Sequence, residues 1–348
     1  MFIINNKNNN NKQRKNMNNF KKIGMTALAA SLVSTSVFAG ELTASGAASL
    51  TAEGVSGEQL NASGNTAFSQ ANNIYFTGSG ELDNGLTVSV SFELDDGSNS
   101  GGATASAGGV WDNHSVTVSS DALGSFTFAG HGGSSAASAL DTTAAGDMWD
   151  NFDGEGAGED AVAVSDSGPG NNSMFYTLPS MVDGLAVNAS YKPRGTGRAS
   201  ATGLSATYSG VEGLSVSYGV TDIETGVSTT SGDQTVMKAS YAYGPVTIGY
   251  SNSDYDIAST ANNDLDQETT SYNISYMVSD DISISYGTEE ISSGVASTVD
   301  AEYEGFKASY TSGGMTVSAS MMDGENTTNT TASDEDLEYW SLGLSFAF

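Results

Sequence analysis

The C-terminal segment Leu337-Glu-Tyr-Trp-Ser-Leu-Gly-Leu-Ser-Phe-Ala-Phe348 alternates between large apolar residues and small or polar ones. One set of alternate positions holds the apolar side chains Trp340, Leu342, Leu344, Phe346 and Phe348. The other set holds Tyr339, Ser341, Gly343, Ser345 and Ala347. Successive side chains of a β-strand point to opposite faces of a sheet, so this period of two predicts a strand with one strongly apolar face.

Segments with the same alternation recur along the chain, at 85–94, 185–192, 214–221 and 282–287. A soluble β-sandwich would also alternate, with its apolar face turned inward. Two features favour an apolar face turned outward to lipid. The polar face is built from Ser, Gly, Thr and Ala rather than from long charged residues, and aromatic residues stand near strand ends, as in the girdles of membrane barrels. These aromatic positions are Phe92, Tyr191, Tyr208, Tyr250 and Tyr310.

The pattern predicts sixteen strands joined by connections that alternate in length. The expected strands are 41–50, 70–82, 85–94, 109–120, 124–131, 172–180, 184–193, 199–209, 213–223, 233–243, 246–257, 267–278, 282–292, 299–311, 314–323 and 336–348. Short turns on one rim and long loops on the other are typical of bacterial outer-membrane barrels. We therefore predict an all-β, antiparallel up-and-down transmembrane barrel, closed because every backbone group in lipid must be paired.

One of these strands departs from simple alternation. In 299–311, Glu302 and Glu304 share parity with the apolar Phe306, so a β-bulge near Gly305 is expected to change the face.

The first 39 residues are expected to precede the barrel rather than belong to it. Residues 1–16 are an Asn- and Lys-rich stretch of low complexity. A basic start at Met17–Lys22, an apolar and small-residue run, and a small-residue site at Ala39 fit a secretory signal peptide, with Met17 an alternative start. A short membrane anchor is the other interpretation, although the run is brief for a spanning helix. The barrel domain is thus predicted to be 40–348.

The predicted barrel is strongly acidic and lacks cysteine. All 41 Asp and Glu residues lie beyond residue 40, where the basic residues are only Lys192, Arg194, Arg198, Lys238 and Lys307. Nucleic acid is excluded as a partner, because phosphate binding requires clustered Lys and Arg. Without cysteine there is neither a disulfide framework nor thiolate chemistry.

Residues suited to catalysis are also scarce. The only histidines are His114 and His131, and no serine stands in a nucleophile-elbow sequence, so an enzyme is not expected. His131 has inward parity and adjoins a long connection, so it either lines a pore or is a chance polar residue. No cofactor is expected. The spacing Asp147…Asp150…Asp153-Gly154-Glu155 is only a loose match to a Ca²⁺ loop and leaves a weakly bound Ca²⁺ ion as an alternative.

The connection at 132–171, the third external loop, is the longest of the chain. A sixteen-stranded barrel is too wide for side chains to fill and leaves an aqueous lumen. We predict that this loop folds into the lumen, anchored to the inner wall by Met148, Trp149 and Phe152. Its acidic residues would then face the pore: Asp147, Asp150, Asp153, Glu155, Glu159 and Asp160.

The few cations are predicted to oppose these acids. Strand parity places Lys192, Lys238 and Lys307 on the inward face, Arg194 continues the first of these strands, and Arg198 lies in the adjoining link. Acids that face cations across a constriction create a transverse field that selects among solutes. In the alternative interpretation, the acids are solvated surface and the cations of 192–198 lie on the rim.

The signal peptide, the sixteen strands, the long third loop and the terminal aromatic strand ending in Phe348 together resemble the Gram-negative general porins, especially the alphaproteobacterial type. This resemblance covers 40–348. It implies a homotrimer in outer-membrane lipid, passive diffusion of small hydrophilic solutes and ions, and insertion by the barrel-assembly machinery. That machinery reads the terminal strand, here Trp340, Leu342, Leu344, Phe346 and Phe348. The chain departs from such porins in lacking a dense cluster of arginines.

The sequence therefore predicts a water-filled channel that prefers cations, because acidic residues far outnumber basic ones. Two alternatives remain: a substrate-specific outer-membrane channel of similar size, and a non-channel surface adhesin or structural barrel. An adhesin would predict several long, repeat-bearing loops, whereas here a single connection stands out by its length.

Overall fold

The computed structural model describes residues 42–57, 65–95, 111–152, 171–193, 200–224, 231–257, 266–293, 299–327, 329 and 336–348. The predicted N-terminal extension and signal peptide, which together span 1–39, lie outside these ranges, and so do large parts of the long connections. Within these ranges, no helix is long and apolar enough to cross a membrane.

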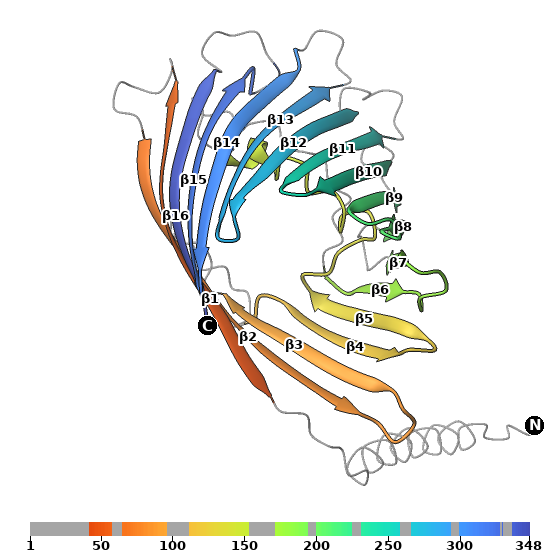
Figure 1. Ribbon diagram of the computed structural model, residues 1–348. Helices are drawn as coiled ribbons and strands as arrows, with labels where there is room; N and C mark the ends of the chain where they lie inside the picture. The colour runs from red at the N-terminus through yellow and green to blue at the C-terminus, as the bar shows by residue number, and fades with distance from the viewer. Residues whose placement is uncertain are drawn as a thin grey trace, which may run out of the picture.

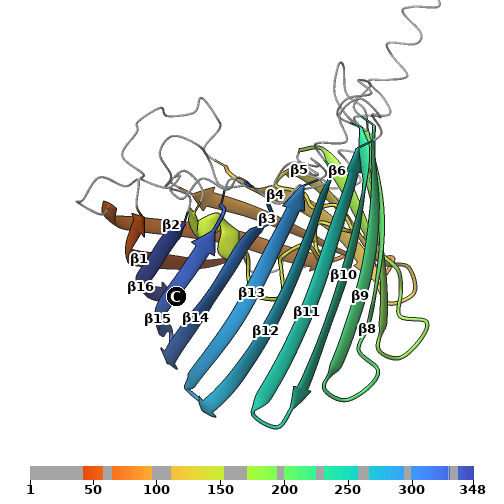
Figure 2. The same ribbon diagram turned by 90° about the horizontal axis from the view of Figure 1, so that it is seen from above.

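Sixteen strands form one closed antiparallel barrel, in which each strand pairs with its neighbours in the chain and β1 pairs with β16 (Figures 1 and 2). They are β1 (Thr43–Gly57), β2 (Asn65–Glu81), β3 (Thr87–Asp95), β4 (His114–Ser120), β5 (Gly124–His131), β6 (Ser173–Thr177), β7 (Leu185–Lys192), β8 (Ser200–Tyr208), β9 (Leu214–Glu224), β10 (Gly232–Tyr243), β11 (Val246–Ile257), β12 (Gln267–Ser279), β13 (Ile282–Ser293), β14 (Ala301–Ser312), β15 (Met315–Glu325) and β16 (Leu337–Ala347). Closure pairs both edges of the sheet, as a lipid environment requires. The predicted fold is confirmed.

The barrel closes at the seam between its first and last strands, where Leu50 lies opposite Leu344. Beyond the end of β16, the backbone N–H of Gly46 donates to the carbonyl of Phe348 at 2.8 Å, and the N–H of Phe348 donates back at 3.0 Å. A Cβ on Gly46 would lie 2.7 Å from the Phe348 ring, so glycine allows the terminal ring to lie against the first strand.

The two faces of β16 are those that the alternation predicted. Trp340, Leu342 and Phe348 are 42%, 53% and 73% exposed on the outside of the isolated chain, whereas Tyr339 is only 7% exposed. An apolar outer surface of this kind is the part of an outer-membrane barrel that lipid covers.

Tight turns join the strands at the rim opposite the long loops. Gly213, between β8 and β9, has a φ of +75°, which L-residues rarely adopt. A Cβ there would also lie 2.3 Å from the carbonyl oxygen of Ala242, so both the conformation and the space require glycine.

Two expectations about the strands were wrong. The connection expected at 51–69 is much shorter, because 51–57 belongs to β1 and 65–69 to β2. The bulge expected near Gly305 is absent, since β14 keeps an unbroken register with β13 and β15 there. Glu302 and Glu304 stay on the exposed outer face of β14, toward its end at the long-loop rim, and no change of face is needed.

Candidate functional site: the lumen and its internal loop

The described part of the third connection, 132–152, lies against the inner wall of the barrel (Figure 1). Backbone N–H groups of this internal loop donate to serine hydroxyls of the wall. Ala136 donates to Ser190 Oγ on β7 at 2.8 Å, and Ala144 donates to Ser251 Oγ on β11 at 2.8 Å. Ala145 donates to Ser271 Oγ on β12 at 3.0 Å. Serine hydroxyls on three strands thus bind main-chain N–H groups along the loop.

Wall glycines bring the loop close enough for these bonds. A Cβ on Gly219 of β9 would lie 3.1 Å from Cα of Ala137. A Cβ on Gly287 of β13 would lie 2.5 Å from Cβ of Ala145, a contact that real side chains do not make. The loop contributes alanines at these points, so a small residue of the loop lies directly against a wall glycine.

Two lysines of the inner wall bind loop carbonyls. Lys238 Nζ on β10 donates to the carbonyl of Thr142 at 2.6 Å. Lys307 Nζ on β14 donates to the carbonyls of Ala145 at 2.9 Å and Gly146 at 3.1 Å. Their inward direction is as expected, but they do not oppose the loop from the far side of the lumen. Parity gives direction within one strand, and only the path of the loop decides which wall it follows.

The other predicted cations add less to this picture. Lys192 is half-buried at the end of β7, on the same face as the buried Ser190. Arg194 and Arg198 lie outside the described residues.

Glu289 on β13 is the central acceptor for the loop, and sequence reasoning missed it. Its side chain is 2% exposed. One carboxylate oxygen accepts from the Thr143 hydroxyl, and the other accepts from the backbone N–H of Trp149 at 3.2 Å. The signal was its parity, because it continues the inward series of Ser285 and Gly287 in β13.

Of the predicted pore acids, the structure describes two. Asp147 shapes the loop itself: its carboxylate accepts from the N–H of Thr143 at 2.8 Å, and its own N–H donates to the Thr143 hydroxyl at 2.7 Å. It also lines, with Lys307, a cavity of about 430 Å³ in the lumen. Asp150 is exposed on the short helix described next. The predicted acids outside the described residues are Asp153, Glu155, Glu159 and Asp160.

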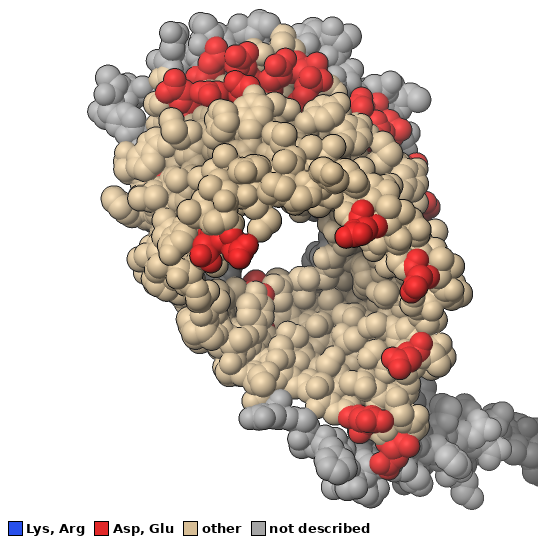
Figure 3. All heavy atoms as spheres, viewed as in Figure 1, with Lys and Arg blue, Asp and Glu red and all other residues tan. Residues whose placement is uncertain are grey.

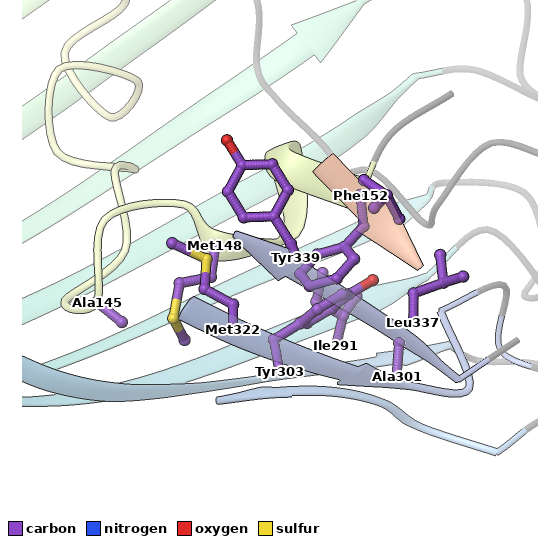
Figure 4. Close-up of a cluster of buried hydrophobic side chains, with 10 residues drawn as sticks. Ala145, Met148, Phe152, Ile291, Ala301, Tyr303, Met322, Leu337 and Tyr339 are labelled. Carbon is purple, nitrogen blue, oxygen red and sulfur yellow. The ribbon is translucent and has the colours of Figure 1, made fainter. Parts of the chain in front are cut away.

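An apolar cluster inside the barrel fixes the end of the described loop. The 3-10 helix η1 (Met148–Phe152) buries Met148 and Phe152, which are 1% and 0% exposed. The Phe152 ring lies 5.3 Å from that of Tyr303 on β14 and 6.0 Å from that of Tyr339 on β16, measured between centroids (Figure 4). Trp149 packs against the same cluster. The predicted apolar anchor is therefore present.

The remaining polar candidates are placed as follows. His131 has the inward direction that its parity predicted, and both His131 and the more exposed His114 line the same inner-wall cavity. Among the described residues, no group of three or more His, Asp or Glu side chains is arranged to hold a metal ion. The loose Ca²⁺ match includes Asp153 and Glu155, which the structure does not describe.

The described part of the loop, 132–152, does not fill the barrel. In the space-filling view an open passage remains in the middle of the ring, and acidic side chains gather over the strand ends at one rim (Figure 3). Among the residues that the structure describes, no Lys or Arg is visible on the face drawn. The barrel is thus hollow, and the internal loop narrows its lumen from one side.

Comparison with known proteins supports the barrel fold. A family model described as Gram-negative porin matches residues 24–290. A porin structure refined at 1.8 Å superposes with a TM-score of 0.63 at 18% identity, covering 88% of this chain and 100% of that chain. A triple mutant of the Rhodopseudomonas blastica porin superposes with a TM-score of 0.60 at 19% identity, with the same coverage. No curated protein sequence matches the chain.

Proposed function

Because this chain belongs to the Gram-negative porin family, a family of outer-membrane channel proteins, we propose that it lets small hydrophilic solutes and ions diffuse passively through its lumen. The observation that carries the proposal is the internal loop, which is bonded to one wall and leaves a passage beside it. A loop held at many points narrows a channel permanently rather than plugging it. No enzymatic activity is proposed.

We propose further that the channel prefers cations. The chain contains no Lys or Arg from residue 23 to residue 191, so β1 to β6 contribute no positive charge. Lys238 and Lys307, on the other part of the wall, have their ammonium groups on loop carbonyls. The acids of the loop and the rims therefore dominate the field along the passage.

A single experiment tests both proposals. The protein is purified, inserted into planar bilayers and studied first in symmetric KCl, where a stable open conductance is expected. The reversal potential in a KCl gradient then gives the selectivity, and its sign should correspond to a greater permeability for K⁺. An anion-selective reversal potential would refute the cation preference but not the channel. A barrel that inserts without any conductance would favour an adhesin or structural role.

The loop's part in setting the pore width is tested separately by deleting 140–165. The deletion should enlarge the single-channel conductance, because it removes most of the internal loop from the passage. Unchanged conductance would mean that the narrowest point lies elsewhere. A specific channel would differ from a general one by saturation with one solute.

We also propose a homotrimer, supported by one feature of the outer face. Gln70 on β2 pairs with Leu50, which pairs in turn with Leu344, so an exposed amide stands in a row of otherwise apolar outer residues. An amide facing hydrocarbon without partners is costly. Contact with a neighbouring barrel would remove this amide from lipid. Chemical cross-linking in detergent and in outer-membrane vesicles tests the oligomer.

A further inference from the structure

A second lumenal cavity, of about 320 Å³, lies on the wall formed by β2 to β6, beside the first residues of the internal loop. Its lining includes Tyr75, Glu93, Asn113, His131, Ser134 and Phe175. It is separate from the cavity that Asp147 and Lys307 line, because the two share no residue. The cavity combines a carboxylate, the imidazoles of His114 and His131, hydroxyls and two aromatic rings.

Glu93 supplies a negative charge that neighbouring residues bond but do not neutralise. Its side chain is 6% exposed. One oxygen accepts from the Asn113 amide, the other accepts from the Asn73 amide at 3.2 Å, and the Tyr75 hydroxyl also bonds to the carboxylate. All three donors are neutral, and Lys192 is not among the cavity's lining residues. A carboxylate has about four acceptor positions, so one remains for a ligand.

His131 supplies an unused polar atom in the same cavity. Its Nδ1 is buried and has no hydrogen-bond partner within the part of the chain that the structure describes. Buried polar atoms are ordinarily hydrogen-bonded. The nitrogen therefore lacks a partner that a solute in the cavity would provide.

We propose that this cavity binds the ammonium group of a small organic cation on its way through the channel. An ammonium group carries three donors and no acceptor, which suits the free acceptor position of Glu93 and the Nδ1 of His131. The rings of Tyr75 and Phe175 add faces that attract a cation. The cavity is near the lower end of the usual size of ligand pockets, about 300 Å³, and so fits a small molecule better than a bare metal ion.

This inference rests on the proposed channel function, and the charge of the site decides the ligand class. A neutral sugar would find hydroxyl partners in the cavity, but it would leave the buried carboxylate without a counter-charge. An organic anion would be repelled by it. The cavity therefore favours a solute with an amine over a neutral solute of equal size.

Current block in planar bilayers tests the site directly. The probe is 2-aminoethanol at neutral pH, where it is a monovalent cation, and glycerol is the neutral probe of similar size. In wild-type protein, 2-aminoethanol should reduce the K⁺ current in a saturable manner, whereas glycerol should not. Glu93→Gln should raise the half-blocking concentration about tenfold, as the loss of one charge-assisted hydrogen bond does. His131→Phe should raise it by a smaller factor.

The matched control is Asp83→Asn, which removes one negative charge from the short turn after β2, outside the cavity, and should leave the block unchanged. If Glu93→Gln fails to fold, as judged by heat-dependent migration on gels, His131→Phe and Tyr75→Phe carry the test. A channel that conducts K⁺ but shows no saturable block overturns this inference and leaves the proposed function intact. Equal block in wild type and the cavity variants also overturns it. Absence of any K⁺ conductance overturns both.

Discussion

The ammonium group of Lys307 on β14 donates a hydrogen bond to the main-chain carbonyl of Ala145 at 2.9 Å, joining two residues far apart in the sequence. The same group reaches the carbonyl of Gly146 at 3.1 Å. A positive charge that would otherwise stand free on the wall is thereby used to hold the internal loop. The same lysine therefore contributes a positive charge to the lumen and a contact that holds the internal loop in place.

Replacing Lys307 by methionine should therefore change two properties at once. The cation preference should increase, because one positive charge leaves the lumen, and the open-channel current should become noisier, because the loop loses two carbonyl contacts. Single-channel recording in a KCl gradient measures both. Lys192→Met is the matched control, since it removes a wall charge that makes no hydrogen bond to the described part of the loop, 132–152. Equal noise in the two variants would argue against a holding role for Lys307.

Replacing Glu289 by alanine should release the loop from the wall. The Thr143 hydroxyl and the Trp149 N–H would lose their buried acceptor, at a cost of about 1–3 kcal/mol for each unsatisfied group. Chymotrypsin should then cut after Phe152, which is 0% exposed in the wild-type protein, or after the partly buried Trp149. Mass spectrometry of the fragments locates the cut. Glu290→Ala, the adjacent exposed carboxylate on the outer face, should stay resistant, and equal cleavage of both variants would contradict the assignment.

A single methyl group at Gly287 should push the loop away from β13. Its Cβ would lie 2.5 Å from that of Ala145, so Gly287→Ala should change the single-channel conductance and weaken the bond from Ala145 to Ser271. Gly78→Ala provides the control, because a Cβ there meets only ordinary contacts at 3.5 Å and 3.7 Å. Both variants add the same methyl to a strand, so a change in both would indicate a general effect on the barrel.

A charge on the lipid-facing side of β16 should impair folding strongly, whereas an added methyl group on its lumenal side should have little effect. Leu342 is 53% exposed on the outer face, and a lysine near the bilayer midplane costs about 2–4 kcal/mol. Leu342→Lys should therefore lower the folding yield in lipid vesicles, whereas Ser345→Thr, on the inner face, should not. Equal yields for the two variants would mean that the faces are assigned backwards.

The sequence was sufficient to predict the barrel, its strand number and its two faces, because each follows from a local period of two. Trp340 and Tyr339, for example, differ in exposure because they are adjacent in one strand and point to opposite faces of the sheet. Local alternation was less informative about strand length. It shortened β1 and β2, whose polar and small residues do not alternate clearly, and it led to a bulge at Gly305 that β14 does not contain.

The path of the internal loop could not be predicted in the same way. The bond from Ala145 to Ser271 joins residues that are 126 positions apart, and neither residue differs from dozens of other alanines and serines. Glu289 had the right parity but no neighbour that marked it as an acceptor. The position of the loop is set by many such long-range bonds together, so sequence alone gave its anchors, Met148 and Phe152, without its course.

The wall binds the internal loop mainly through the peptide groups of the loop. This binding does not depend on most of the side chains that the loop presents to the passage. Residues that face the solution can change from acidic to neutral or basic while the wall serines and lysines continue to hold the same carbonyl and amide groups. The diameter of the pore and its charge can therefore change independently, and mutations of loop side chains can alter which solutes pass without changing the backbone contacts that position the loop.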